Sequence, residues 1–274
     1  MTNETETTES RNPRTLGIDR ASTQEMLQMI QRENLRAAEA VGEAIPGITR
    51  AVDSIAAGMA EGGRLIYIGA GSSGRLGILD AAECPPTYGV DSSLVSGIIA
   101  GGNECMFRAS EGAEDSGEAG RRDILAKNLN PHDHVVGISA AGNAMYVVSA
   151  LRAAKEAGCV TIGLTSNPGS LIAKESDIPI VVLTGAEAIT GSTRMKAGTV
   201  QKMVLNMLST AVMIKAGHVY SNLMINLKPS NVKLRRRVIS IVREILECGE
   251  DEAVKLLAAN DWNIRKAVKS AGKE

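Results

Sequence analysis

Five short apolar runs, each bounded by turn residues, constrain the fold of this chain more than any other feature. They are RLIYI from Arg64, LVSGIIA from Leu94, HVVGISA from His134, VTIGLT from Val160 and IPIVVLT from Ile178. Helix-compatible stretches separate most of them. Buried strands that alternate with helices predict an α/β fold, in which a parallel sheet carries helices on both faces. Ligands of such sheets bind at the carboxyl ends of the strands, where the strand order reverses.

The segment before the first strand has the pattern of a polar arm followed by helices. Residues 1–14 lack an apolar period, so we expect a flexible arm, or one that becomes ordered on a partner subunit. Ser22 and Glu25 form a capping box that begins a helix. Pro46-Gly47 is expected to break this helix, and a second one should begin with residues 48–60.

The last third of the chain has helical periodicity. Helices are expected over Thr193 to about Ala216, from Asn231 onwards, near Asp251–Ala259 and near Asp261–Ser270. The chain then divides into an N-terminal arm with helices (1–50), a central α/β domain (51–225) and a small helical C-terminal module (226–274). The basic run Lys233–Arg237 fits a solvated helix face better than a nucleic-acid site.

Composition excludes several classes of function. Only 2% of the 274 residues are aromatic and the net charge is -1, which disfavours both nucleic-acid and anionic-membrane binding. No apolar run approaches the roughly 20 residues of a membrane span. The four cysteines lack CxxC spacing, so we expect reduced thiols in a cytoplasmic protein.

A glycine-rich loop follows the first apolar run. Residues 69–75 read GAGSSGR, which matches the GxGxxG spacing of dinucleotide-binding loops. Ser72 and Ser73 place hydroxyls where such a loop usually needs only backbone, and no acidic residue ends a strand about 20 residues later. Gly71, Ser72 and Ser73 at the start of a helix instead suit a phosphomonoester. The alternative is a tight turn with capping serines.

Two glutamates near this loop are candidates for acid–base chemistry. Glu83 ends an apolar helical stretch before Cys84-Pro85-Pro86, a position that the helix dipole disfavours for a carboxylate. Glu114 lies in an acidic cluster that glycine interrupts. From composition alone, a solvated acidic turn explains Glu114 better than catalysis does. Two carboxylates beside one phosphosugar would nevertheless suit general acid–base catalysis.

Long strings across the chain resemble one family, the bacterial N-acetylmuramic acid 6-phosphate etherases of the sugar isomerase (SIS) domain superfamily. The matching strings are TESRNP from Thr8, IDRAST from Ile18, RLIYIGAGSSGRLGILDAAECPPTYGV from Arg64, IAGG from Ile99, EGAEDS from Glu111, TGSTRMKAGT from Thr190 and QKMVLNMLST from Gln201. They cover nearly the whole chain and are far more specific than the GxGxxG spacing.

The resemblance implies cleavage of the lactyl ether at C3 of the substrate, which gives N-acetylglucosamine 6-phosphate and D-lactate in cell-wall amino sugar recycling. Glu83 matches the family's proton donor and Glu114 its second catalytic carboxylate. The implied route is elimination followed by hydration, without a metal or redox cofactor. The family also implies a homodimer whose active sites are built from both subunits.

The string TGSTRMKAGT offers a further set of donors. Ser192, Thr193 and the start of the following helix could bind an anion or a sugar. Simple N-capping would need only one of these hydroxyls.

One loop departs from the family pattern. Where the family has a loop close to AASGRTPYV, this chain has SAAGNAMYV from Ser139. Ser139 and Asn143 are the remaining candidates for phosphate binding there, and loss of a charge-assisted donor would cost about 1.5–3 kcal/mol. The altered loop leaves open an etherase with a different substrate, or a sugar-phosphate-binding regulator. An aldose–ketose isomerase is a third possibility, and the two glutamates and the ECPP segment favour the etherase over both.

Overall fold

A five-stranded parallel sheet forms the centre of the protein. The computed structural model describes residues 8–108, 110–227, 229 and 231–273. The strands are β1 (Leu65–Gly69), β2 (Val95–Ile99), β3 (His134–Ile138), β4 (Val160–Thr165) and β5 (Ile178–Val181). Their order is β2-β1-β3-β4-β5, so the order reverses between β1 and β3. All five predicted strands and the parallel α/β fold are confirmed.

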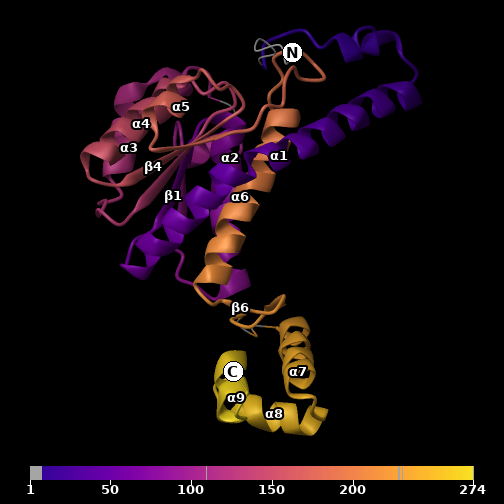
Figure 1. Ribbon diagram of the computed structural model, residues 1–274, viewed down its shortest axis with the longest axis vertical. Coiled ribbons are helices and arrows are strands. Elements are labelled where there is room, and N and C mark those ends of the chain that lie inside the picture. The colour runs from indigo at the N-terminus through magenta and orange to yellow at the C-terminus, as the bar shows by residue number, and fades with distance from the viewer. Residues whose placement is uncertain (1–7, 109, 228, 230, 274) are drawn as a thin grey trace.

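Helices cover both faces of the sheet (Figure 1). On one face lie α1 (Thr23–Ala60), α2 (Gly71–Tyr88) and α6 (Lys196–Lys215); on the other lie α3 (Gly117–Leu125), α4 (Met145–Glu156) and α5 (Leu171–Glu175). The alternation within β1 separates the two apolar cores: Leu65 and Tyr67 pack under α1, α2 and α6, whereas Ile66 and Ile68 pack under α4. The long helix α6 starts at Lys196 rather than at Thr193.

The expected helix break at Pro46-Gly47 is wrong, because α1 runs without interruption for 38 residues. Val41, Ala44 and Ile48 are buried in the core on both sides of the proline, so packing outweighs the single hydrogen bond that the proline removes. Gly47 serves close packing instead of a turn. A Cβ atom at this position would lie 3.2 Å from the Pro179 carbonyl oxygen of β5.

Helix α2 also continues through its prolines, which corrects the expectation that it ends at Glu83. The helix extends past Pro85-Pro86 to Tyr88, and Gly89 (φ 67°) closes it by donating its N–H to the Pro85 carbonyl. Buried Cys84 and Tyr88 hold the last turn against the core, and the Tyr88 hydroxyl donates to Thr210 Oγ1 at 3.1 Å. Glu83 therefore lies inside a helix, and the argument from the helix dipole does not apply to it.

The polar segment before α1 packs against its own chain, which corrects the prediction of a flexible or partner-bound arm for residues 8–14. Thr8, Asn12 and Thr15 are buried. Asn12 Nδ2 donates to the Ala186 carbonyl at 3.2 Å, and Thr15 Oγ1 donates to the Ala188 carbonyl at 2.8 Å. Two short 3₁₀ helices, η1 (Pro13–Thr15) and η2 (Ile18–Arg20), then lead into α1. Residues 1–7 of the predicted arm lie outside the described residues.

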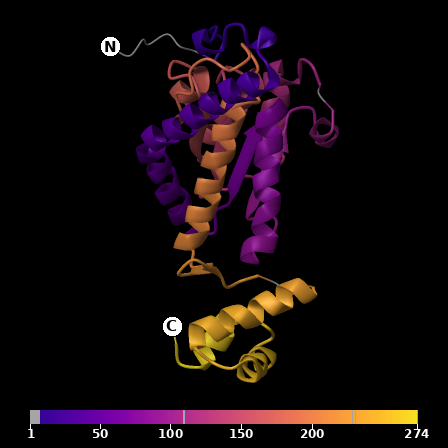
Figure 2. The same ribbon diagram turned by 90° about the vertical axis from the view of Figure 1, so that its right-hand side faces the viewer.

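The C-terminal helices form a separate cluster with its own apolar core. A short hairpin of β6 (Val219–Tyr220) and β7 (Leu223–Met224), which was not predicted, leads to α7 (Val232–Leu246), α8 (Glu250–Ala259) and α9 (Ile264–Ser270). The three helices lie where the sequence predicts them. These helices pack on one another and on the hairpin. Figure 2 shows them set apart from the α/β domain. None of the helices in the described ranges is long and apolar enough to cross a membrane.

Candidate active site

The point where the strand order reverses brings two loops together at the carboxyl ends of β1 and β3. The β1 loop turns sharply into α2, and a Cβ atom on Gly69 would lie 2.7 Å from the Gly74 nitrogen, so both glycines are required by this close approach. Gly71 has a positive φ of 51° at the start of α2. Such a reversal point is where open α/β sheets bind their ligands.

The two serines of the β1 loop point in different directions. Ser73 is buried, and its hydroxyl donates to Gln201 Oε1 of α6 at 3.0 Å. Ser72 is exposed and lines a groove of about 490 Å³ between α2 and α6. Of the two hydroxyls, that of Ser72 is therefore accessible in the groove, whereas that of Ser73 joins α2 to α6.

Three cationic side chains line this groove beside Ser72: Arg75, Arg194 and Lys202. The guanidinium of Arg75 donates to the Met106 carbonyl at 3.1 Å and to the Arg108 carbonyl at 3.2 Å, so the loop after β2 fixes its position. A groove lined by two hydroxyl side chains, Ser72 and Thr199, and by three cations has the chemistry to bind an anionic sugar.

Glu114 lies on the other side of the same helix start. It belongs to the 3₁₀ helix η4 (Ala113–Asp115) and is exposed. Glu114, Gly71 and Arg75 line one cavity of about 380 Å³. The structure thus brings Glu114 next to the glycine-rich loop, as expected if both act on one phosphosugar.

Glu83 lines a different cavity of the same chain. This cavity of about 380 Å³ lies between α2 and α6 and includes Lys202 and Asn206. Its lining shares no residue with the cavity of Glu114 among the described residues. Eleven residues of helix separate Ser72 from Glu83, roughly 16 Å along the axis. The two candidate carboxylates therefore do not meet within one chain.

A hydrogen-bonded network adjoins Glu83, and sequence reasoning missed it. The Tyr67 hydroxyl donates to Asp80 Oδ2 at 2.9 Å, and Asn206 Nδ2 donates to Asp80 Oδ1 at 3.1 Å. Lys202 Nζ donates to Asn206 Oδ1 at 2.5 Å. Burial raises the pKa of the Asp80 carboxyl, and burial beside Asp80 raises the pKa of the Tyr67 phenol well above 10.0. An aspartate within the apolar stretch GILDAA is the signal that could have found this network.

The altered loop after β3 is held by internal hydrogen bonds. Ser139 is buried, and its Oγ accepts from the Gly142 N–H at 3.0 Å. Asn143 Oδ1 accepts from the Leu171 N–H at 3.1 Å. Asn167 of the next loop donates to the Ala141 carbonyl at 3.3 Å and also bonds Thr8. The polar atoms of Ser139 and Asn143 that form these bonds stabilise the loop.

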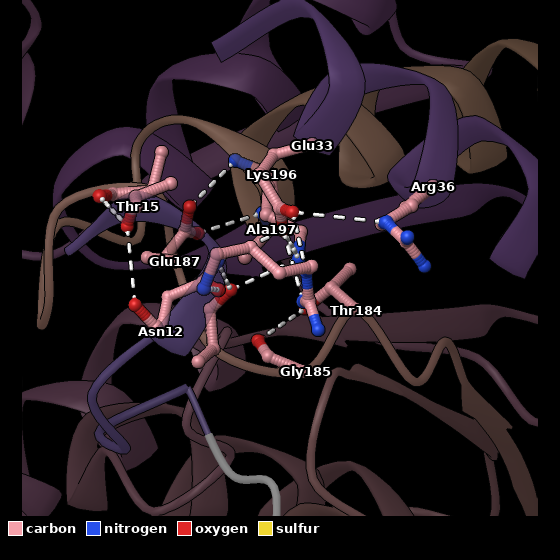
Figure 3. Close-up of polar contacts among 12 residues, drawn as sticks. Asn12, Thr15, Glu33, Arg36, Thr184, Gly185, Glu187, Lys196 and Ala197 are labelled. Atoms are coloured by element: carbon pink, nitrogen blue, oxygen red, sulfur yellow. Dashed lines mark hydrogen bonds and ion pairs between the residues drawn. The ribbon is translucent and has the colours of Figure 1, made fainter. Parts of the chain in front are cut away.

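A carboxylate of the same chain, that of Glu187, is already bound at the start of α6. Glu187 is fully buried, and its carboxylate accepts from the Lys196 N–H at 2.9 Å and the Ala197 N–H at 3.0 Å (Figure 3). Ser192 and Thr193 lie half-buried in the turn before the helix. Any binding by these two residues therefore involves their side chains, because Glu187 occupies the first-turn amides that would bind an anion.

Beneath this turn lies a buried ionic cluster centred on Glu33 of α1 (Figure 3). Its carboxylate accepts from Lys196 Nζ at 2.8 Å, Asn12 Nδ2 at 2.9 Å and Arg14 Nε at 2.6 Å. Glu33 and Lys196 are each 1% exposed. Despite burial, the hydrogen bonds from Arg14 and Lys196 lower the pKa of Glu33 to about 2. The cluster joins the N-terminal segment, α1 and α6 into one unit.

Within the described part of the chain, no group of three or more His, Cys, Asp or Glu side chains is placed to hold a metal ion.

Comparisons with known proteins agree on the fold and on one family. Residues 47–155 match the model of the glucokinase regulatory protein N-terminal SIS domain, and residues 108–211 match the SIS domain model. The N-acetylmuramic acid 6-phosphate etherase of Salmonella agona (strain SL483) is 50% identical over 260 residues, which cover 95% of this chain and 88% of that protein. The etherase of Salmonella choleraesuis (strain SC-B67) is 49% identical over the same shares.

Solved structures share the fold at low identity. A phosphoheptose isomerase from Francisella tularensis aligns with a TM-score of 0.53 at 15% identity, covering 71% of this chain and 100% of that chain. A phosphoheptose isomerase from Neisseria gonorrhoeae aligns with a TM-score of 0.51 at 19% identity, covering 70% of this chain and 98% of that chain. These likenesses show the SIS fold.

Proposed function

The chain belongs to the N-acetylmuramic acid 6-phosphate etherase family, and we propose that it carries out the family's reaction with Glu83 and Glu114 as catalytic residues from two subunits of a homodimer. The reaction converts N-acetylmuramic acid 6-phosphate into N-acetylglucosamine 6-phosphate and D-lactate. The observation that carries the proposal is the position of Glu114 next to the glycine-rich loop, in a cavity that shares Arg75 with the cationic groove of Ser72. All four cysteines are free thiols, which is consistent with a cytoplasmic enzyme.

The substrate binds through its phosphate at the start of α2. Ser72, the first-turn N–H groups and the guanidinium of Arg75 supply hydrogen bonds and positive charge there. This anchor places the open-chain sugar, with its C1 aldehyde, between the catalytic carboxylates. Because the aldehyde acidifies the C2 proton, a positioned carboxylate can remove it.

The reaction then proceeds by elimination and hydration. Glu114 removes the C2 proton, the electron pair forms the C2–C3 double bond, and the C3–oxygen bond breaks. Glu83 gives its proton to the departing lactate oxygen. Water next adds to C3 of the unsaturated aldehyde, giving one proton to Glu83, while Glu114 returns its proton to C2. Both carboxyl groups end in their starting protonation states.

Separation of the two glutamates within one chain supports a site shared between subunits. Two glutamates that act on neighbouring carbons of one sugar must lie within a few ångströms of it, yet they line different cavities here. Large apolar side chains are exposed on the outer faces of α2 and α6, among them Leu79 and Ile214. A second subunit that packed on these helices would bury such side chains.

Mixing of inactive variants tests both parts of the proposal. We expect D-lactate release by the wild type, and loss of release in Glu83→Ala and in Glu114→Ala. If each site takes one glutamate from each subunit, a heterodimer of the two variants contains one intact site. An equimolar mixture, dissociated and reassembled, then recovers about a quarter of the wild-type activity. No recovery in verified heterodimers would contradict the shared site.

A sugar-phosphate-binding regulator is the second candidate. The match to the glucokinase regulatory protein SIS domain and the internally bonded Asn143 in the altered loop favour it. A regulator would release no D-lactate from N-acetylmuramic acid 6-phosphate while sugar phosphates still raised its melting temperature. Lactate release that depends on Glu83 excludes this candidate.

A further inference from the structure

Lys202 occupies the junction between the phosphate groove and the cavity of Glu83. It is half-buried on α6 and lines both: the groove that begins at Ser72 and the cavity that contains Glu83. Among the described residues, no other residue lines both the groove and this cavity. In the part of the chain that the structure describes, Lys202 is the one cation that lines the cavity of Glu83, so a substrate group that reaches Glu83 meets its ammonium group.

A chain of hydrogen bonds through Asn206 and Asp80 fixes the side chain of Lys202. Asn206, one helical turn later, accepts from Nζ through Oδ1 and donates through Nδ2 to Asp80. Asp80 is 1% exposed and is fixed in turn by the hydroxyl of fully buried Tyr67. Because Asp80 is bonded by Tyr67 and Asn206, its carboxylate contacts Lys202 only through Asn206.

The ammonium has donors left for a ligand. A lysine side chain has three N–H donors, and the described residues take one of them, through Asn206. The charged groups that share its two cavities are Glu83, Asp80, Arg75 and Arg194. Glu83 and Asp80 line the cavity of Glu83, whereas Arg75 and Arg194 line the groove, so Lys202 supplies the positive charge for an anionic group that enters the cavity of Glu83.

The chemistry of the proposed substrate favours a cation at this place. The ether oxygen that Glu83 protonates is attached to the carbon that bears the lactyl carboxylate. That carboxylate therefore comes close to Glu83 whenever the ether oxygen does. Once Glu83 has given up its proton, two carboxylates lie side by side, and a nearby cation offsets their repulsion.

We propose that Lys202 binds the lactyl carboxylate of the substrate and so makes the enzyme specific for sugars with an ether-linked carboxylate, with Asn206 and Asp80 as positioning residues. The inference rests on the proposed function and adds a specificity-determining residue to its site. It separates the two anionic ends of the substrate: Ser72 and Arg75 take the phosphate, and Lys202 takes the carboxylate.

Two substrates test the assignment. One is N-acetylmuramic acid 6-phosphate, and the other is its analogue with the lactyl carboxylate converted to the amide. Release of N-acetylglucosamine 6-phosphate is measured for both. We expect Lys202→Met to lower kcat/KM for the acid roughly ten- to a hundredfold and for the amide less than about threefold. Lys202→Arg should restore part of the loss, and Lys215→Met, on the same helix, should behave as the wild type.

Inhibition separates a carboxylate site from a phosphate site. D-lactate and inorganic phosphate are each used as competitive inhibitors. In Lys202→Met we expect the inhibition constant for D-lactate to rise while that for phosphate stays unchanged. Equal losses of kcat/KM on both substrates, or weaker inhibition by phosphate alone, would overturn the assignment.

Asn206→Leu tests the positioning role. A residue that only stabilises the fold would affect both substrates alike, whereas loss of the clamp on Lys202 should raise KM for the acid and leave the amide nearly unchanged. If the wild type releases no lactate, the proposed function fails. If it does and the variants fail to separate acid from amide, the Lys202 inference alone fails.

Discussion

Replacement of Glu33 by glutamine tests the buried ionic cluster that joins the N-terminal segment to α6. The variant keeps the size of the side chain and removes its charge. A carboxyl pKa lowered from 4.5 to about 2 corresponds to about 3 kcal/mol of stabilisation at neutral pH. The change also leaves Lys196, which is 1% exposed, without its counter-charge. We therefore expect Glu33→Gln to lower the free energy of unfolding by about 3–5 kcal/mol.

The loss should depend on pH in a defined direction. Because the pKa of Glu33 is lower in the folded state, its stabilisation is fully present above 4.5 and declines as the pH falls towards 2. Urea unfolding of the wild type and of Glu33→Gln at pH 7 and pH 4 measures this dependence. The difference in the free energy of unfolding between the two proteins should be about 1 kcal/mol smaller at pH 4 than at pH 7.

A matched control and a local readout complete the test. Glu43→Gln changes an exposed glutamate on the same helix and should alter stability by less than about 0.5 kcal/mol. Trypsin should cleave after Arg11 and Arg14 faster in Glu33→Gln, because the segment that the cluster holds is released. The reasoning would be refuted if Glu33→Gln lowered the free energy of unfolding no more than Glu43→Gln does. It would also be refuted if the difference in this free energy between the wild type and Glu33→Gln grew as the pH fell.

Three further changes follow from the geometry of other positions. Ser72→Ala should raise KM about tenfold through loss of a hydrogen-bond donor to the phosphate. Ser73→Ala should mainly lower the melting temperature, because the Ser73 hydroxyl donates to Gln201. Steady-state kinetics and thermal unfolding distinguish the two variants. Burial lowers the pKa of His134 below 6.5, so stability should fall as the pH drops below 6.5, and His134→Gln should flatten this dependence in urea titrations at pH 8 and 5.5. Gly142→Ala should destabilise by at least about 2 kcal/mol, because φ is 74° and a Cβ would lie 2.4 Å from the Ser170 side chain; a change below about 0.5 kcal/mol would contradict this.

The strands could be predicted from the sequence because a sheet buried on both faces leaves continuous apolar runs. Each run from Leu65 to Val181 is short, rich in branched residues and bounded by turn residues, so local pattern and tertiary role coincide. The helices of the C-terminal module were predicted for the same reason. Their amphipathic pattern matches the one apolar core that they share.

The proline positions could not be predicted from local rules. Pro46 and Pro85-Pro86 lie inside helices because buried residues on both sides of them pack against distant parts of the chain and so hold the backbone in place. Similarly, the docking of residues 8–14 depends on Glu33 and on the carbonyls of residues 186 and 188. No local pattern contains these contacts.

The candidate site was predictable in its composition but not in its geometry. Ser72, Glu83 and Glu114 were found from the loop and from the family strings. The two glutamates line different cavities because of the length of α2 and the way that it packs. Their separation in the sequence does not reveal this. Lys202 and Asn206 were missed because their role comes from contact between α2 and α6, about 120 residues apart in sequence.

Internal neutralisation of the α6 start by Glu187 has a consequence for the kinetics of association. With that terminus occupied, the positive charge that the groove offers to the proposed substrate, which has a phosphate and a carboxylate, comes from Arg75, Arg194 and Lys202, which solvent reaches. Counter-ions screen such charges over a Debye length of about 10 Å at 0.1 M salt. Substrate capture should therefore slow steeply as ionic strength rises, while the chemical steps in the cavity of Glu83 change little.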